Sequence, residues 1–181
     1  MNIERLQVGM LQTNCYLLAG EKKVVIIDPG SEAQKIIKKV EELKGENSLV
    51  EIVNTHYHYD HTLANEEIRK HFGAKILIHE NEEKFVSFKP DIFLKDGDQI
   101  QINGTTLEVV NTPGHSKGSI CLIGDKVAFT GDTVFAQGVG RTDLPGGNMY
   151  EMENSLEEVA KKFKDGMKIY PGHGDNFTWQ E

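Results

Sequence analysis

Three histidines and one aspartate fall within six residues of this chain, in the stretch Thr55-His56-Tyr57-His58-Tyr59-Asp60-His61-Thr62. The apolar run 49–54 before them is typical of a buried strand, and the run 63–72 after them has helical spacing. The histidines therefore occupy a strand-to-helix turn, which can project ligands in several directions. Because imidazole and carboxylate groups bind zinc and iron, the stretch indicates a metal site rather than a surface turn that is merely rich in histidine.

Strands and helices alternate in the first half of the chain. We expect strands at residues 3–8, 14–19, 24–27, 49–54 and 75–79, a helix from the N-cap Ser31 to about 44, and a helix at 63–72. The second half is richer in hairpins, because Asn103-Gly104 separates two alternating runs. There we expect strands at 99–102, 105–110, 119–123, 126–130 and 168–170, and a helix at 149–164.

Histidine or aspartate follows four of these predicted strands. Strand ends of one sheet system can meet at one edge, where loops supply ligands from a rigid base. The candidate ligands are His56, His58, Asp60, His61, His115, Asp132 and His173. They exceed the three or four protein ligands of one zinc ion and suit two divalent ions that share a carboxylate. His71 and His79 lie outside this pattern, and we expect both to be structural or solvent-facing.

Composition bounds the class of protein. The length of 181 residues predicts a single domain over 1–181, and the chain has no apolar run of the ~20 residues that a membrane span needs. A net charge of −8, with lysines and glutamates mixed on the predicted helix faces, argues against nucleic acid as a partner. The amino terminus lacks the pattern of a secretory signal, so we expect a cytoplasmic protein with Cys15 and Cys121 as buried core thiols. The oligomeric state stays open.

Short motifs in a fixed order give the chain a family resemblance. They are Thr13-Asn14-Cys15-Tyr16, Ile27-Asp28-Pro29-Gly30, the stretch 55–61, Thr112-Pro113-Gly114-His115-Ser116, Phe129-Thr130-Gly131-Asp132, Gly140-Arg141-Thr142-Asp143 and Tyr170-Pro171-Gly172-His173-Gly174. Together they resemble the metallo-β-lactamase superfamily, and within it the short hydrolases similar to glyoxalase II (hydroxyacylglutathione hydrolase). The resemblance covers nearly the whole chain. It implies an α/β fold, the four-layer αββα sandwich, with metals at one edge of the sheets.

The resemblance also implies how the ligands divide. One metal is expected on His56, His58 and His115, the other on Asp60, His61 and His173, with Asp132 bridging. Common lactamases have a cysteine in place of Asp132, and flavodiiron oxygen reductases have a glutamate in place of His58. Glyoxalase II carries a carboxyl-terminal helical extension that binds glutathione. Here the sequence runs only eight residues past His173, so we expect loose glutathione specificity.

The expected chemistry is hydrolysis of a small-molecule thioester or ester by a metal-bound hydroxide, since two divalent cations lower the pKa of a shared water toward neutrality. Zinc is the first choice of metal, with iron and manganese as alternatives. Asp60 and Asp132 are the candidate catalytic residues: Asp60 orients the hydroxide and Asp132 fixes the metal spacing. Asp28 is a candidate acceptor for a ligand imidazole, or else a turn residue.

Three further residues are candidates for substrate contacts. Arg141 is expected to bind a substrate carboxylate or to pair with Asp143 within its own loop. The bulky Tyr57 and Tyr59 either pack around the histidine turn or line the substrate cleft.

Other functions fit the same ligands. A mononuclear iron persulfide dioxygenase, with iron on two histidines and an aspartate, is the first alternative. Oxygen-dependent consumption of a glutathione persulfide would identify it. A lactone hydrolase is the second. A non-catalytic metal-binding scaffold is the third, and it predicts bound metal without turnover of any acyl substrate.

Overall fold

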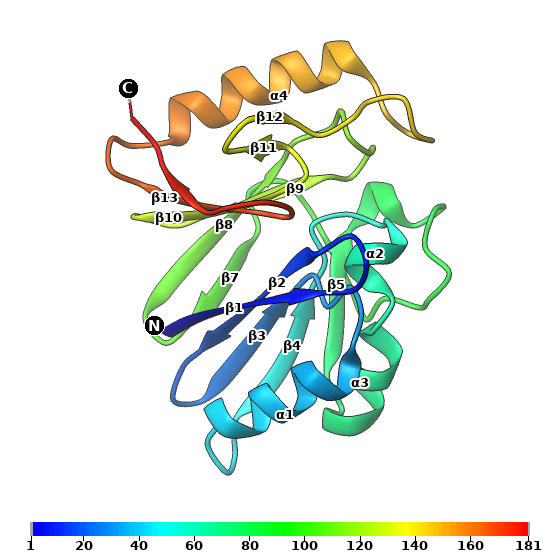
Figure 1. Cartoon of the computed structure of the whole chain (residues 1–181), viewed down its shortest axis with the longest axis vertical. Helices are drawn as coiled ribbons and strands as arrows, with labels where there is room; N and C mark the ends of the chain where they lie inside the picture. The colour runs from blue at the N-terminus through cyan, green and yellow to red at the C-terminus, as the bar shows by residue number, and fades with distance from the viewer. Residues whose placement is uncertain (1, 181) are drawn as a thin grey trace.

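Two β-sheets pack face to face in this protein, with helices on both outer faces (Figure 1). The computed structural model describes residues 2–180. Sheet A contains, in spatial order, β1 (Asn2–Val8), β2 (Thr13–Ala19), β3 (Lys23–Ile27), β4 (Leu49–Val53), β5 (Lys75–His79) and β6 (Ile92–Leu94). Sheet B contains β14 (Phe177–Thr178), β13 (Lys168–Pro171), β10 (Val127–Gly131), β9 (Ile120–Ile123), β8 (Thr105–Asn111) and β7 (Gln99–Ile102). A small hairpin pairs β11 (Val134–Phe135) with β12 (Gly138–Val139). This is the αββα sandwich that the family resemblance implied.

Three apolar layers hold the sandwich together. Tyr16 and Val25 of sheet A pack between the sheets with Phe129 of sheet B. Helices α1 (Ala33–Leu43) and α3 (Asn65–Phe72) cover the outer face of sheet A, and α4 (Met149–Lys162) covers the outer face of sheet B (Figure 1). Strand β2 is buried on both faces, so its successive residues enter different layers, with Cys15 on the helix side. Cys15 and Cys121 are both buried free thiols, as expected.

Strand directions explain why polar residues gather at one edge. Strand β3 is parallel to β4, and β10 is parallel to β13. Strand β8 is antiparallel to β9, which is antiparallel to β10, so β8 also ends at the edge where β10 ends. Strand β2 runs against β3 and therefore begins at the edge where β3 ends. The loops that follow β3, β4, β8, β10 and β13 consequently meet the loop that precedes β2.

The structure corrects several predicted boundaries. The helix expected at 63–72 is α3, which begins only at Asn65, and a separate short helix that was not predicted, α2 (Tyr59–Thr62), precedes it. The chain between the two helices is held by Asn54 Nδ2, which donates to the carbonyl of His61, and by Ala64 N, which donates to Pro29 O. Ser31 is not the N-cap of α1. Glu32 holds that position with φ 53°, and its carboxylate accepts from Gly9 N at 2.9 Å instead of capping the helix. Helix α4 ends at Lys162, and Phe163 after it is buried against sheet B.

The hairpin predicted at Asn103-Gly104 is present. Asn103 and Gly104 have φ values of 44° and 77°, as the tight turn between β7 and β8 requires. Sequence patterns did not predict β6, the short β11, β12 and β14, or the 3₁₀ helix η1 (Glu80–Glu82). Within residues 2–180, none of the helices is both long enough and apolar enough to cross a membrane.

Candidate metal centre

The histidine turn is held in place by the residues around it. Strand β4 ends at Val53, and the chain then passes through the buried His56 and the half-buried His58 into α2, which carries Asp60 and His61. Gly30 packs directly under α2, because a Cβ at that position would lie 1.5 Å from the carbonyl oxygen of Asp60. The Asp-Pro-Gly turn after β3 and the histidine turn after β4 therefore fit together only when residue 30 has no side chain.

His56, His58 and His115 form the first cluster of candidate metal ligands. Nδ1 of His58 lies 2.8 Å from Nε2 of His115. Nδ1 of His115 lies 2.7 Å from the carbonyl oxygen of Arg141, which can only accept, so Nδ1 carries the proton and Nε2 has a free lone pair. Nε2 of His56 and Nε2 of His58 are buried without a hydrogen-bond partner among the described residues.

Asp60, His61 and His173 form the second cluster. Nε2 of His173 lies 3.2 Å from Nε2 of His61 and 3.2 Å from Oδ2 of Asp60. Both imidazoles are held through Nδ1, His61 by Oδ2 of Asp28 at 2.9 Å and His173 by the carbonyl oxygen of Leu11 at 3.1 Å. Their Nε2 atoms therefore face the centre of the cluster.

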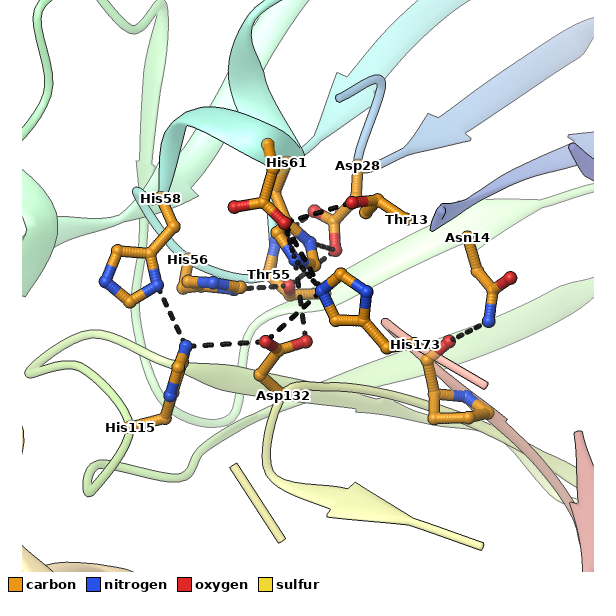
Figure 2. A network of polar contacts seen from close by, with 12 residues as sticks. Thr13, Asn14, Asp28, Thr55, His56, His58, His61, His115, Asp132 and His173 are labelled. Carbon is orange, nitrogen blue, oxygen red and sulfur yellow. Dashed lines mark hydrogen bonds and ion pairs between the residues drawn. The ribbon is translucent and has the colours of Figure 1, made fainter. Parts of the chain in front are cut away.

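Asp132 lies between the clusters (Figure 2). Its Oδ1 is 3.5 Å from His61 Nε2, and its Oδ2 is 3.5 Å from His115 Nε2 and 3.6 Å from His173 Nε2. Gly172 leaves room for this carboxylate, since a Cβ at residue 172 would lie 2.2 Å from Oδ1 of Asp132. One carboxylate thus reaches both histidine clusters.

These donors fit divalent cations. Nδ1 of His58 lies 2.8 Å from Nε2 of His115, and Nε2 of His61 lies 3.2 Å from Nε2 of His173, so each pair of nitrogens needs a proton or a cation between them. Burial and the neighbouring His115 lower the pKa of His58 to about 4, so this ring is neutral near pH 7. Burial opposes protonation of His61, but Asp132 and Asp28 outweigh it and raise its pKa to about 9. The carboxylates thus attract positive charge to the place where the lone pairs converge.

Other predicted residues have defined positions. Asp28 accepts from Thr55 N at 2.7 Å and Thr55 Oγ1 at 2.6 Å in addition to His61, so it orients a ligand as well as ending a strand. The Arg141 guanidinium makes two 2.7 Å hydrogen bonds to Asp143, as expected for a pair within the loop, and both side chains are exposed.

Tyr57 and Tyr59 differ from each other. Tyr57 stacks on Phe85 at 4.9 Å between ring centroids, and its hydroxyl donates to Pro145 O at 2.9 Å. It therefore packs beside the turn. Tyr59 is 67% exposed at the start of α2.

His71 and His79 make contacts of other kinds. His71 lies on the surface with Nε2 3.2 Å from Glu41, and the buried His79 accepts from Asn81 N at the start of η1. The solvent-facing and structural roles expected for them agree with these contacts.

Sequence reasoning gave no role to four residues that hold the site. Thr13 Oγ1 donates to Oδ2 of Asp60 at 3.0 Å, and Asn14 Nδ2 donates to the carbonyl of Pro171 at 2.9 Å. Thr55 joins Asp28 to the His56 ring. The fully buried Glu82 accepts from Ser116 Oγ and from Gly118 N, directly after His115. Thr13, Asn14 and Thr55 lie within the motifs that carry the family resemblance, whereas Glu82 lies in the charged run 80–84, which contains none of those motifs.

Comparison with known proteins agrees with this geometry. Residues 8–173 match the family model of the metallo-β-lactamase superfamily. The chain is 35% identical to hydroxyacylglutathione hydrolase GloC of Haemophilus influenzae, over 98% of this chain and 93% of that protein.

Solved structures with a similar fold come from several kinds of protein. The BLEG-1 B3 metallo-β-lactamase has a TM-score of 0.88 and 28% identity, covering 98% of this chain and 94% of its own. ETHE1 from Myxococcus xanthus has a TM-score of 0.86 and 27% identity, covering 98% and 80%. TTHA1623, solved in a di-iron-bound form, has a TM-score of 0.83 and 27% identity, covering 97% and 94%. The family model matches most of the length of the chain, and the fold and the arrangement of the candidate ligands agree with it. The chain therefore belongs to the metallo-β-lactamase superfamily.

Proposed function

We propose that this protein is a metal-dependent hydrolase of thioesters or esters, with S-lactoylglutathione as the model of its substrate class. The observation that carries the proposal is the division of seven donors into two clusters with Asp132 between them. The similarity to a hydroxyacylglutathione hydrolase over 98% of the chain supports a thioester as the substrate. The similarity to TTHA1623 in its di-iron-bound form supports a site for two ions.

Each cluster would hold one ion. His56, His58 and His115 would bind the first, and Asp60, His61 and His173 the second, with Asp132 reaching both. When bound, two divalent cations polarise a carbonyl oxygen and lower the pKa of water toward neutrality. Zinc is our first choice, with iron or manganese as alternatives, since all three accept histidine and carboxylate ligands.

The residues of the chain orient the reaction. In the metal-free protein, burial alone would raise the pKa of Asp60, but hydrogen bonds from His173 and Thr13 and the charge of His61 hold it below its usual range. A bound cation would take the place of the imidazole protons and would keep this carboxyl ionised in the same way. Asp60 is therefore a carboxylate that accepts a hydrogen bond from the attacking water and orients it, and it is a weak base. Four imidazoles have their Nδ1 atoms fixed by Thr55, Asp28, Arg141 and Leu11, so the direction of each Nε2 lone pair is set before a substrate arrives.

Turnover of a small substrate panel by the metal-loaded protein tests the proposal. We expect hydrolysis of S-lactoylglutathione and of the lactoyl thioester of a simple thiol, with a smaller rate on lactones. A preference for the glutathione thioester of about a hundredfold or more, equal to about 2.7 kcal/mol, would demonstrate a specific glutathione site and contradict the loose specificity expected from the sequence. Absence of hydrolysis of every thioester and ester would refute the proposed function.

A second candidate is the persulfide dioxygenase, because Asp60, His61 and His173 form a group of two histidines and one aspartate, the kind of donor set expected for its single iron. The same purified protein decides between the two. Iron-loaded protein that consumes oxygen with glutathione persulfide, while thioesters stay intact, identifies the dioxygenase. Zinc-loaded protein that hydrolyses thioesters identifies the hydrolase.

A further inference from the structure

A pocket of about 220 Å³ lies beside the second cluster, between the turn that joins β1 to β2 and helix α2. We propose that this pocket is a subsite for an unbranched apolar chain of the thioester substrate. The proposal rests on the hydrolase function proposed above and deepens it, because it names the chemical class that the site selects.

Exposed apolar side chains line the pocket. Met10 is 101% exposed, Leu11 is 53% exposed, and Tyr59 and Leu63 are each 67% exposed. Apolar residues scattered singly on a surface need no explanation, but here four large side chains from two separate segments border one hollow. Covering them with an apolar group removes this surface from water.

The pocket is continuous with the candidate metal centre. Asp60 lines it, and so does Thr13, whose hydroxyl donates to Oδ2 of Asp60 at 3.0 Å. The carbonyl of Leu11 accepts from Nδ1 of His173 at 3.1 Å. Two residues of the pocket wall therefore position two ligands of the second cluster, so a chain bound in the pocket would extend from a group bound at that cluster.

Hydrogen bonds hold the backbone of the turn that forms one wall of the pocket. The turn closes through a hydrogen bond from Gln12 N to Gly9 O at 3.2 Å, with φ values of 53° at Gln12 and 68° at Gly9. Gly9 N donates to the carboxylate of Glu32, which anchors the turn to the start of α1. A turn whose backbone is already held loses less free energy to ordering when a ligand enters.

Size and charge select the occupant. At about 30 Å³ for each water-sized group, the volume holds about seven methylene-sized groups. Asp60 is the charged residue in its lining, and it lies on the side of the metal centre. By contrast, the hollow between η1 and α4 is lined by Glu80, Glu83, Lys84, Lys117 and Glu151. That second hollow suits polar groups, whereas the pocket beside α2 suits a hydrocarbon chain.

Two series of thioesters test the proposal and show which side of the bond the chain occupies. One series varies the acyl chain from acetyl to octanoyl on a single small thiol. The other keeps acetyl and varies the thiol from ethanethiol to octanethiol. In one of the two, we expect kcat/KM to rise about fourfold for each methylene that enters the pocket, and the other series to stay flat.

Variants locate the effect. The double variant Met10→Ser/Leu63→Ser should reduce the preference for octanoyl over acetyl, or for octanethiol over ethanethiol, by about tenfold or more. Both side chains are solvent-exposed, so the fold is expected to persist. Leu49→Ser is the matched control, because Leu49 is 68% exposed at the start of β4, the end of the strand opposite the histidine turn.

Binding of 1-hexanol to the zinc-loaded protein gives a readout that needs no turnover. We expect amide chemical shifts of Gly9, Leu11 and Leu63 to move in the wild type and in Leu49→Ser, and to stay fixed in the double variant. If no thioester is hydrolysed, the proposed function fails and the hexanol titration alone decides the subsite. Flat chain-length series, or hexanol shifts that are unchanged in the double variant, would overturn the subsite.

Discussion

Nδ1 of His61 donates to Oδ2 of Asp28 at 2.9 Å, and both groups are buried. Thr55 supplies two more donors to the same carboxylate, its backbone N–H and its hydroxyl. Asp28 thus joins the loop after β3 to the ligand on α2 and fixes which nitrogen of His61 carries the proton. A carboxylate that only accepts hydrogen bonds is well suited to this position.

Asp28→Asn should weaken metal binding about 10- to 100-fold, since an amide nitrogen in place of Oδ2 cannot accept from His61. Competition against a chelator of known affinity measures the change. Asp125→Asn is the control, because Asp125 is exposed in the turn between β9 and β10 and pairs with Lys164. Equal metal affinity in Asp28→Asn and the wild type would show that Asp28 only ends a strand.

Asp132→Ala should reduce metal content below the two ions per chain expected of the wild type, and should reduce hydrolysis with it. The reason is the position of Asp132 within 3.6 Å of a ligand nitrogen in each cluster. Elemental analysis after dialysis measures the content, with His71→Ala and His79→Ala as controls that should retain both ions. One tightly held ion in the wild type, even with metal in excess, would rule out the binuclear site.

Glu82→Gln should change how stability depends on pH. Burial raises the pKa of Glu82 above its ordinary value, against the hydrogen bonds from Ser116 and Gly118, which lower it. The folded state therefore holds this proton more tightly than the unfolded state. The stabilisation from this proton on Glu82 is complete at pH values below the pKa that Glu82 has in the unfolded chain. It is lost as the pH rises through the higher pKa of the folded state, by about 1.4 kcal/mol for each unit of the shift.

Urea unfolding of the wild type and Glu82→Gln between pH 4 and pH 8 checks this sign. The free energy of unfolding of the variant, relative to the wild type, should increase with pH. Glu83→Gln is the control, since Glu83 is exposed beside it. A relative stability of Glu82→Gln that fell as pH rose would mean that folding stabilises the ionised carboxylate.

Gly172→Ala should lower metal content while leaving most of the sandwich folded. Its Cβ would lie 2.2 Å from Oδ1 of Asp132 and 2.8 Å from Cε1 of His61, so one of these groups must move. Elemental analysis and circular dichroism measure the two effects separately. Gly45→Ala is the control, because a Cβ there meets nothing closer than 3.3 Å. Unchanged metal content in Gly172→Ala would show that the carboxylate has freedom to shift.

The sequence predicted the features that rest on local pattern. Apolar runs identified the long strands, and the polar residues after them identified the seven donors, because ligands at strand ends carry their own residue types. Pattern could not predict the short helix α2 or the break between it and α3, since a hydrogen bond from Asn54 to the carbonyl of His61 and the close packing of Gly30 against Asp60 hold that segment. Ser31 failed as an N-cap because Glu32 adopts a left-handed conformation and binds the β1–β2 turn.

Partners distant in sequence were also beyond prediction. Glu82 accepts hydrogen bonds from Ser116 and Gly118, which lie 34 and 36 positions further along the chain. The charged run around Glu82 gives no sign that this residue is buried. The pocket beside α2 arises in the same way, since Met10 and Leu63 look like ordinary surface or helix residues until the fold places them on one hollow.

Sheet A is built entirely from residues 2–94 and sheet B from residues 99–178, so the molecule is divided in space where it is divided in sequence. The first half supplies His56, His58, Asp60 and His61, and the second supplies His115, Asp132 and His173. During synthesis, the four donors of the first half therefore leave the ribosome before the three donors of the second half have been made. Neither cluster can be completed until the second half has emerged, and the second cluster waits for His173, so full coordination becomes a late event in the life of a newly made chain.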